Sequence, residues 1–257
     1  LASVRTPSRV GTARVQSMVS AMREVSDERL NFAPPKLDDV ASYFCTGGTT
    51  GLPKIAVRTH RTEVANALQL ASAFGSAIEG SGKSVFCGLP LFHVNAQIGT
   101  GLTPWSVGAH VILGTPQGYR TQGMIPSFWD VAAHFRCVFF SGVPTVYAAL
   151  LQHPPKGQDL SELKYGVCGA APMPVELFHR FQRETGIKIL EGYGLTETTG
   201  AGTCLLSEHH VGGRLRSCGQ PYPGIEVRVV DGDGRIASRV AVAAPEVLTL
   251  LRGERLD

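Results

Sequence analysis

The chain has 257 residues, of which 43% are hydrophobic and 18% are charged, so it can bury a full core and is unlike a disordered protein. Its net charge of +3 comes without a basic cluster, which gives no case for nucleic-acid binding. No apolar run reaches the roughly 18 residues of a membrane span and no signal peptide is recognisable, so we expect a soluble, cytoplasmic protein.

The chain begins with a polar lead-in, residues 1–39, that carries one helical pattern around Met18 and Met22. The apolar segment Val40–Cys45 follows, and the β-branched run Ile55–Val57 comes after a polar interval. This arrangement predicts a strand, a loop and a second strand.

The interval between these strands, Thr46–Lys54, reads TGGTTGLPK. Each glycine costs a helix about 1 kcal/mol and Pro53 has no amide donor, so the segment must be a loop. Bare backbone N–H groups, threonine hydroxyls and the Lys54 ammonium together favour a nucleotide-phosphate site. A flexible surface hairpin is the alternative interpretation. The candidate phosphate-binding residues are Thr46, Gly47, Gly48, Thr49, Thr50, Gly51 and Lys54.

The loop is not a Walker motif, because Lys54 follows a proline and a strand comes next where that motif opens a helix. A look-alike occurs at residues 77–84, which include Gly82, Lys83 and Ser84. There a helical pattern precedes the glycines and a strand pattern follows, which is the reverse of the required order. We interpret residues 77–84 as a turn.

Strand and helix patterns alternate from residue 61 onward. The predicted helices are Arg61–Phe74, Gln97–Trp105, Ile125–Phe135, Pro144–Leu151 and Pro174–Thr185. The predicted strands are Ser84–Leu89, Ala109–Leu113, Cys137–Phe140, Leu163–Cys168 and Ile187–Glu191. This alternation predicts an α/β fold with parallel-rich sheets flanked by helices, over residues 40–211.

The composition changes near Gly212, and residues 212–257 read as the start of a small antiparallel β unit. Its clearest part is a strand, turn and strand around Asp231–Gly234, which lacks the ligand count of a calcium loop. The six cysteines form no CxxC pair, so we expect reduced thiols. The cluster Glu208–His210 has no matching ligands four residues on and predicts no metal site.

Ligands of parallel α/β sheets bind at the carboxyl ends of the strands, and three loops there carry unusual residues. Leu89–Asn95 holds His93, which is either a packed histidine or a site residue. Cys168–Pro172 offers small residues that either pack a helix closely or leave a slot for a flat ring.

The third loop, Glu191–Thr198, places Tyr193 between two glycines, so its ring can present a face to a base. Thr196 adds a hydroxyl, and Glu197 adds a carboxylate of the kind that holds magnesium beside a triphosphate. A helix start with Thr196 as its cap is the alternative.

Five motifs in order, TGGTTGLPK, LPLFHV, CGAAP, EGYGLTETT and the GQPYPG of Gly219–Gly224, resemble the adenylate-forming superfamily of acyl-CoA synthetases, luciferases and peptide-synthetase adenylation domains. The resemblance spans roughly residues 40–230. It implies that the carboxylate of a fatty acid or another small organic acid attacks the α-phosphate of ATP to give acyl-AMP, and that a thiol, usually coenzyme A, then takes the acyl group.

The resemblance also implies roles for matching residues. Thr46 to Lys54 would hold the β- and γ-phosphates, Tyr193 would stack on adenine, and Thr196 would contact the α-phosphate. Glu197 would bind Mg²⁺. The remaining residues of the implied nucleotide site are Gly169, Ala170, Ala171, Glu191, Gly192 and Gly194. The implied acyl site consists of His93 beside the reacting carboxylate and of Val94, Asn95, Gly142 and Val143.

The chain departs from the family at Gly47, where serine or threonine is usual, and in its length. The superfamily continues into a ribose-binding aspartate and a small C-terminal domain with a catalytic lysine. We therefore expect a truncated core that lacks this domain and whose own turnover is in doubt. The alternatives are an aminoacyl- or aryl-adenylating domain that serves a carrier protein, and a nucleotide-binding remnant without turnover. The acyl chain length and the oligomeric state are not predicted.

Overall fold

The computed structural model describes residues 9–10, 13–14, 18–24, 32–46, 54–74, 77–80, 82–204 and 217–236. The chain divides into two compact units, Leu1–Lys36 and Leu37–Asp257. In the first unit, β1 (Arg9–Val10) pairs antiparallel with β2 (Ala13–Arg14), and α1 spans Met18–Glu24. No helix within the described ranges is long and apolar enough to cross a membrane.

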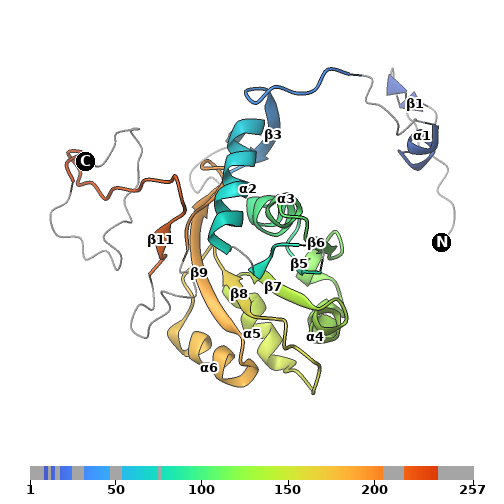
Figure 1. Ribbon diagram of the computed structural model, residues 1–257, viewed down its shortest axis with the longest axis vertical. Helices are drawn as coiled ribbons and strands as arrows, with labels where there is room; N and C mark the ends of the chain where they lie inside the picture. Colours follow the sequence, from blue (N-terminus) through green and yellow to red (C-terminus); the bar gives the residue numbers. More distant parts are fainter. Residues whose placement is uncertain are drawn as a thin grey trace. The chain divides into compact units, whose positions relative to one another are not determined.

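The second unit is built on a seven-stranded sheet in the order β11-β10-β9-β8-β7-β5-β6 (Figure 1). Its strands are β5 (Ser84–Cys87), β6 (His110–Leu113), β7 (Cys137–Gly142), β8 (Tyr165–Cys168), β9 (Lys188–Leu195), β10 (Gly200–Cys204) and β11 (Gln220–Pro221). The strands from β6 to β9 run parallel, and β10 and β11 add antiparallel pairs. The predicted α/β fold with a parallel-rich sheet is confirmed.

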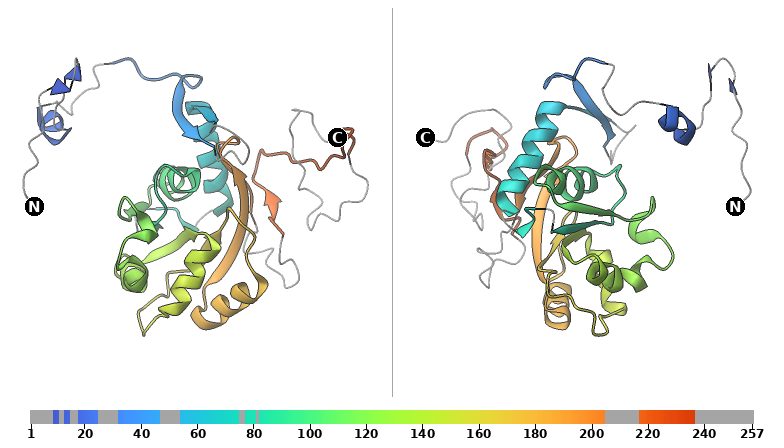
Figure 2. Two further views of the ribbon diagram at one scale, coloured as in Figure 1. Left: turned by 180° about the vertical axis from the view of Figure 1, so that it is seen from behind. Right: turned by 45° about the vertical axis from the view of Figure 1, so that its right-hand side comes forward.

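Helices cover both faces of this sheet. They are α2 (His60–Phe74), the π-helix η2 (Asn95–Leu102), α3 (Thr103–Ser106), the 3-10 helix η3 (Gly118–Arg120), α4 (Met124–His134), α5 (Pro144–Gln152) and α6 (Val175–Thr185). Neighbouring residues of β7 serve opposite faces, because side chains alternate along a strand. Phe140 packs with Phe128 of α4 and Phe181 of α6, whereas Phe139 stacks on Phe74 of α2. Figure 2 shows strands between α2 (cyan) and α5 (yellow-green).

The helix ends follow from local chemistry. Pro144 opens α5, where its missing N–H needs no partner. Gly186 ends α6 with a φ of +72°, and its N–H donates to the carbonyl of Gln182. The helices predicted at Pro144–Leu151 and Pro174–Thr185 are confirmed within one residue at each end.

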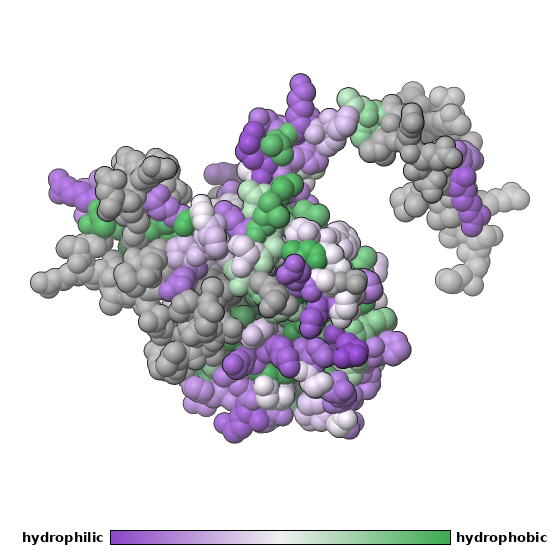
Figure 3. All heavy atoms as spheres, in the orientation of Figure 1, coloured by the Kyte–Doolittle hydropathy of each residue, from purple (hydrophilic) through white to green (hydrophobic). Residues whose placement is uncertain are grey.

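Exposed apolar side chains mark one end of the second unit. Tyr43, Val57 and Leu68 are each more than half exposed, on β3 (Val40–Cys45), β4 (Ile55–Thr59) and the outer face of α2. Figure 3 shows hydrophobic residues where β3 and α2 lie and mostly hydrophilic residues where α5 and α6 lie. The inner face of α2 therefore supplies its contribution to the core, whereas Leu68 on its outer face is exposed.

Three segments refine the sequence predictions. The turn assigned to residues 77–84 is confirmed, since Lys83 N–H donates to Gly80 O and β5 follows. The expected end of a strand at Glu191 is wrong, because β9 continues to Leu195. Of the antiparallel unit expected after residue 212, the structure shows an isolated bridge between Val230 and Ile236, and residues beyond 236 lie outside the described part. The domain boundaries stay predictions.

Candidate functional site

The predicted strand, loop and strand form a hairpin in which the loop joins the two strands. β3 and β4 pair antiparallel with Cys45 opposite Ile55, and the buried Thr46 donates its N–H to the carbonyl of Lys54 at 2.8 Å. This hydrogen bond closes the base of the loop. The candidates within it, Gly47, Gly48, Thr49, Thr50 and Gly51, lie outside the described residues.

A buried polar network fastens this hairpin to the segment that follows β9. Arg58 of β4 is 2% exposed and donates to Ser42 Oγ at 3.0 Å from Nε and to the Thr199 carbonyl at 2.9 Å from Nη1. Its Nη2 lies 3.2 Å from Glu63 Oε1 and also donates to the side chain of Gln97. The hairpin, α2, η2 and the turn after β9 are therefore tied through one guanidinium.

Burial costs a guanidinium its hydration, and this lowers the pKa of Arg58, while Glu63 opposes the change. The pKa of an arginine is high enough that the group stays charged, so the carboxylate and the surrounding acceptors must compensate the charge. The Arg58 guanidinium also lies 3.7 Å from the centre of the Phe44 ring, a cation–π contact. The sequence pattern did not point to Arg58 as part of the site.

The larger of two adjoining cavities, about 490 Å³, lies at the carboxyl ends of the parallel strands. Segments far apart in the sequence meet on it, as expected for the strand ends of an α/β sheet. Its lining includes Cys45, Leu89, Pro90, Phe92, His93, Val94, Asn95, Arg120, Val143, Thr145, Ala170, Gly194 and Thr196. The stem of the predicted phosphate loop and the residues after β9 therefore face one cavity.

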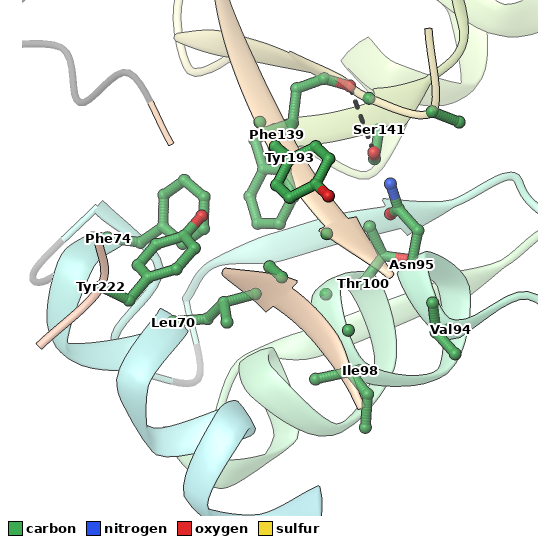
Figure 4. A pocket seen from close by; sticks show the side chains of 18 residues that line it. Leu70, Phe74, Val94, Asn95, Ile98, Thr100, Phe139, Ser141, Tyr193 and Tyr222 are labelled. Atoms are coloured by element: carbon green, nitrogen blue, oxygen red, sulfur yellow. Dashed lines mark hydrogen bonds between the residues drawn. The ribbon is translucent and has the colours of Figure 1, made fainter. Parts of the chain in front are cut away.

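The smaller cavity, about 130 Å³, adjoins the first and lies among α2, η2 and strands β7 to β10 (Figure 4). Tyr193, Gly169 and Gly192 line it, together with apolar side chains. Four residues line both cavities: Val94, Asn95, Ala170 and Gly194. A molecule in the smaller cavity would thus lie next to one in the larger cavity.

The backbone at this junction is unusual. A Cβ on Gly194 would overlap the carbonyl oxygen of Gly200, so the β9–β10 pair requires glycine there. Ala170 has a φ of +67°, a left-handed conformation that L-residues adopt at a cost of about 1–3 kcal/mol. The π-helix η2 begins at Asn95, and π-helical segments occur frequently at functional sites. Three unusual backbone features, at Gly194, at Ala170 and at the start of η2, thus lie where the two cavities join.

His93 lies in the larger cavity beside Phe92, with the two ring centres 4.6 Å apart. Burial and then the nearby Arg120 lower the pKa of the His93 imidazole, which favours the neutral form. A neutral imidazole accepts a hydrogen bond through one nitrogen and donates through the other. His93 is therefore able to contact a carboxylate without presenting a full positive charge.

Other predicted residues lie apart from the two cavity walls. Glu191 is buried and its Oε1 accepts the N–H of Met173 at 3.0 Å, so this carboxylate holds the loop after β8. Gly142 is buried at the end of β7, whereas Ala171 and Glu197 are exposed. The interpretation of Thr196 as a helix cap is wrong, since a turn leads from it into β10.

No group of three potential metal ligands occurs within the part of the chain that the structure describes. The cluster Glu208–His210 lies outside that part. Mg²⁺ commonly takes only one or two carboxylates and completes its shell with water and phosphate oxygens. The exposed carboxylate of Glu197, next to Thr196 on the larger cavity, fits such a donor set.

We expect the cysteines to differ sharply in reactivity. Burial raises the pKa of both Cys137 and Cys168 to about 12, so almost no reactive thiolate forms near pH 7.5. Cys45 is exposed on the larger cavity. Brief iodoacetamide treatment of the folded protein, followed by peptide mass spectrometry, should show Cys45 modified well before the other two. Equal modification of Cys137 under native conditions would contradict the burial.

The family model described as AMP-binding enzyme matches residues 4–242. The chain is 40% identical over 203 residues to a marinolic acid–CoA ligase of Pseudoalteromonas sp. (strain SANK 73390), covering 77% of this chain and 31% of that protein. It is 30% identical to a long-chain-fatty-acid–CoA ligase of Bacillus subtilis (strain 168), covering 92% and 42%.

Among solved structures, the N-terminal domain of FACL13 from Mycobacterium tuberculosis, bound to an inhibitor, is similar with a TM-score of 0.69. The sequence identity is 28%, and the match covers 85% of this chain and 52% of that domain. The chain thus spans less than half the length of the two curated relatives it matches.

Proposed function

Since the chain belongs to the AMP-binding enzyme family, we propose that it carries the nucleotide and acyl sites of an ATP-dependent acid–thiol ligase. In this reaction a carboxylate oxygen attacks the α-phosphorus of ATP and pyrophosphate leaves with the electron pair of the broken P–O bond. A thiol, coenzyme A in our proposal, then attacks the acyl carbon and AMP leaves.

The observation that carries this proposal is the junction of the two cavities at Val94, Asn95, Ala170 and Gly194. An acid in the smaller cavity presents its carboxylate there to a nucleotide in the larger one. Holding two reactants in contact removes much of the entropic barrier to their reaction. No nucleophilic side chain is needed for either step.

Both reactants are anions, so the site must neutralise charge as the new bond forms. We assign this role to the N–H groups of the Thr46–Lys54 loop, the Lys54 ammonium and the Thr196 hydroxyl. Bound Mg²⁺ would supply further neutralisation of the phosphates. Glu197 is the carboxylate we assign to hold it. Tyr193, which is 49% exposed, and the Gly169–Ala171 backbone are assigned to the adenine, at the junction where Ala170 and Gly194 line both cavities.

The amino-acid alternative finds less support in the residues of the smaller cavity. No aspartate or glutamate is among its described lining residues, so a substrate ammonium would be buried there without a counter-charge. Burying an unpaired charge is costly. An uncharged acyl group suits this lining better.

The decisive test is acid-dependent pyrophosphate release. The protein containing this chain, given ATP, Mg²⁺ and a panel of carboxylic acids, should release pyrophosphate with some acids, and hydroxylamine should trap the activated acyl group. Coenzyme A should then yield a thioester detectable by mass spectrometry. A response to amino acids alone would favour a carrier-protein domain.

The exposed Cys45 on the larger cavity allows nucleotide binding to be tested separately from turnover, and so identifies a remnant that binds ATP without reacting. Such a protein would release no pyrophosphate with any acid, yet ATP would still protect Cys45 from iodoacetamide. Absence of both pyrophosphate release and protection would overturn the nucleotide site itself.

A further inference from the structure

The smaller cavity points to the substrate class. Building on the proposed function, we propose that this cavity receives the acyl group and selects acids whose carbon skeleton is a single ring or an equally compact apolar group. The same cavity makes long-chain fatty acids poor substrates.

The first argument is size. The cavity measures about 130 Å³. An apolar protein cavity of about 150 Å³ lined by leucine, isoleucine and phenylalanine binds benzene, which sets the scale for one ring. A long alkyl chain has several times the volume of that ring. The volume of the cavity therefore matches one ring and falls short of a fatty-acid tail.

The second argument is the chemistry of the walls. Figure 4 shows Leu70, Phe74 and Tyr222 on one side of the cavity and Val94 and Ile98 on the other. These side chains are apolar or aromatic, and no charged residue is among the described lining. Apolar contact of this kind stabilises a buried hydrocarbon in proportion to the apolar area that it removes from water.

The third argument is that the far wall is closed by packed rings. Phe74 and Phe139 both line the cavity, and they stack with ring centres 5.3 Å apart and an interplanar angle of 10°. Phe139 is 2% exposed and forms part of the core between the sheet and α2. A longer acyl chain would have to displace a core side chain, which costs far more than moving a surface one.

The polar end of the cavity fixes the direction of the substrate. The Asn95 amide stands on the wall shared with the larger cavity, and Figure 4 shows it next to Ser141, whose Oγ donates to the Val167 carbonyl. The carboxylate therefore belongs at this shared wall. The ring points inward, toward Phe74 and Phe139.

The two cavities differ in the charge of their walls, although apolar side chains such as Ile125 and Val143 also line the larger one. Its described lining contains Arg120 and His93, whereas the smaller cavity has no cationic or titratable nitrogen in its described lining. A guanidinium favours an anion and loses hydration when a hydrocarbon covers it. The charge distribution thus assigns the nucleotide to the larger cavity and the acyl group to the smaller one.

Two variants test the cavity directly. Val167 is half-buried and lines the cavity, so Val167→Ala should enlarge it at small cost to the core. A Cβ at Gly99 would meet its nearest atom, Asn95 Oδ1, at 3.4 Å, so Gly99→Ala fits the backbone while narrowing the cavity. Val131→Ala, on the opposite face of the sheet, is the matched control.

The measurement is kcat/KM for benzoate, cyclohexanecarboxylate, 2-naphthoate and palmitate, followed as pyrophosphate release. The parent protein should use the single-ring acids at least about tenfold better than palmitate. Val167→Ala should raise the ratio of 2-naphthoate to benzoate about tenfold, Gly99→Ala should lower it, and Val131→Ala should leave it unchanged.

A preference for palmitate, or a ratio unaffected by both cavity variants, would overturn the inference and leave the proposed function standing. Pyrophosphate release with none of these acids but with a charged or amino acid would overturn the assignment of an apolar substrate. No release with any acid would overturn the proposed function, and this inference with it.

Discussion

Replacement of Arg58 by leucine should lower the free energy of unfolding of the protein by about 3–5 kcal/mol. Arg58 is 2% exposed, and the side chain of its partner Glu63 is only 9% exposed. The leucine would leave Glu63 buried without a counter-charge and the Thr199 carbonyl without its donor. Urea unfolding followed by tryptophan fluorescence, to which the buried Trp129 contributes, measures the change.

Two controls separate burial of a charge from loss of an ion pair. The double variant Arg58→Leu/Glu63→Leu should recover a large part of the lost stability, because two apolar residues often replace a buried pair without loss. Arg61→Leu breaks an ion pair with Asp38 whose side chains are 57% and 78% exposed, and it should change stability little. Parental stability of Arg58→Leu alone would show that the network is dispensable.

The order of strands and helices was predictable because proline and glycine residues mark the ends of many of these elements in the sequence. Pro144 and Gly186 mark helix ends, and the buried strand β5 ends just before Gly88 and Pro90. The apolar periods between such signals are long enough to distinguish helix from strand. The parallel sheet then follows from the alternation itself.

The extension of β9 was missed because glycines favour loops in any local interpretation. Gly194 is instead required by a partner strand, since only glycine allows Gly200 of β10 so close. Likewise, the helical period predicts a helix at Gln97–Trp105 but not the π-helical winding of Asn95–Leu102. Both features depend on contacts made across the fold, which a local pattern does not contain.

The candidate site was predictable as an ordered set of motifs, and the structure brings His93, Asn95, Ala170 and Thr196 to one cavity. Arg58 was missed because a single arginine in a short strand gives no local signal of burial. Its partners Glu63 and Thr199 lie 5 and 141 residues further along the sequence. The positioning of a site is thus harder to predict than its composition.

Replacement of Lys54 by alanine should reduce kcat/KM for ATP about 10²-fold or more, the loss typical when one charge-stabilising donor is removed. Lys54 stands at the base of the loop, where its own carbonyl accepts the Thr46 N–H, so the backbone holds this position whatever the side chain. Its side chain is exposed, and alanine should leave the midpoint of thermal unfolding unchanged.

Separate kinetic constants for ATP and for the carboxylic acid identify the role of Lys54. A point charge on the phosphates should affect ATP and leave the KM for the carboxylic acid close to the parental value. Lys54→Arg keeps the charge and should retain part of the activity, while Lys156→Ala, an exposed lysine after α5, should have no effect. An unchanged kcat/KM for ATP in Lys54→Ala would remove the Lys54 side chain from the phosphate site, and with it one of the reasons to place ATP in the larger cavity.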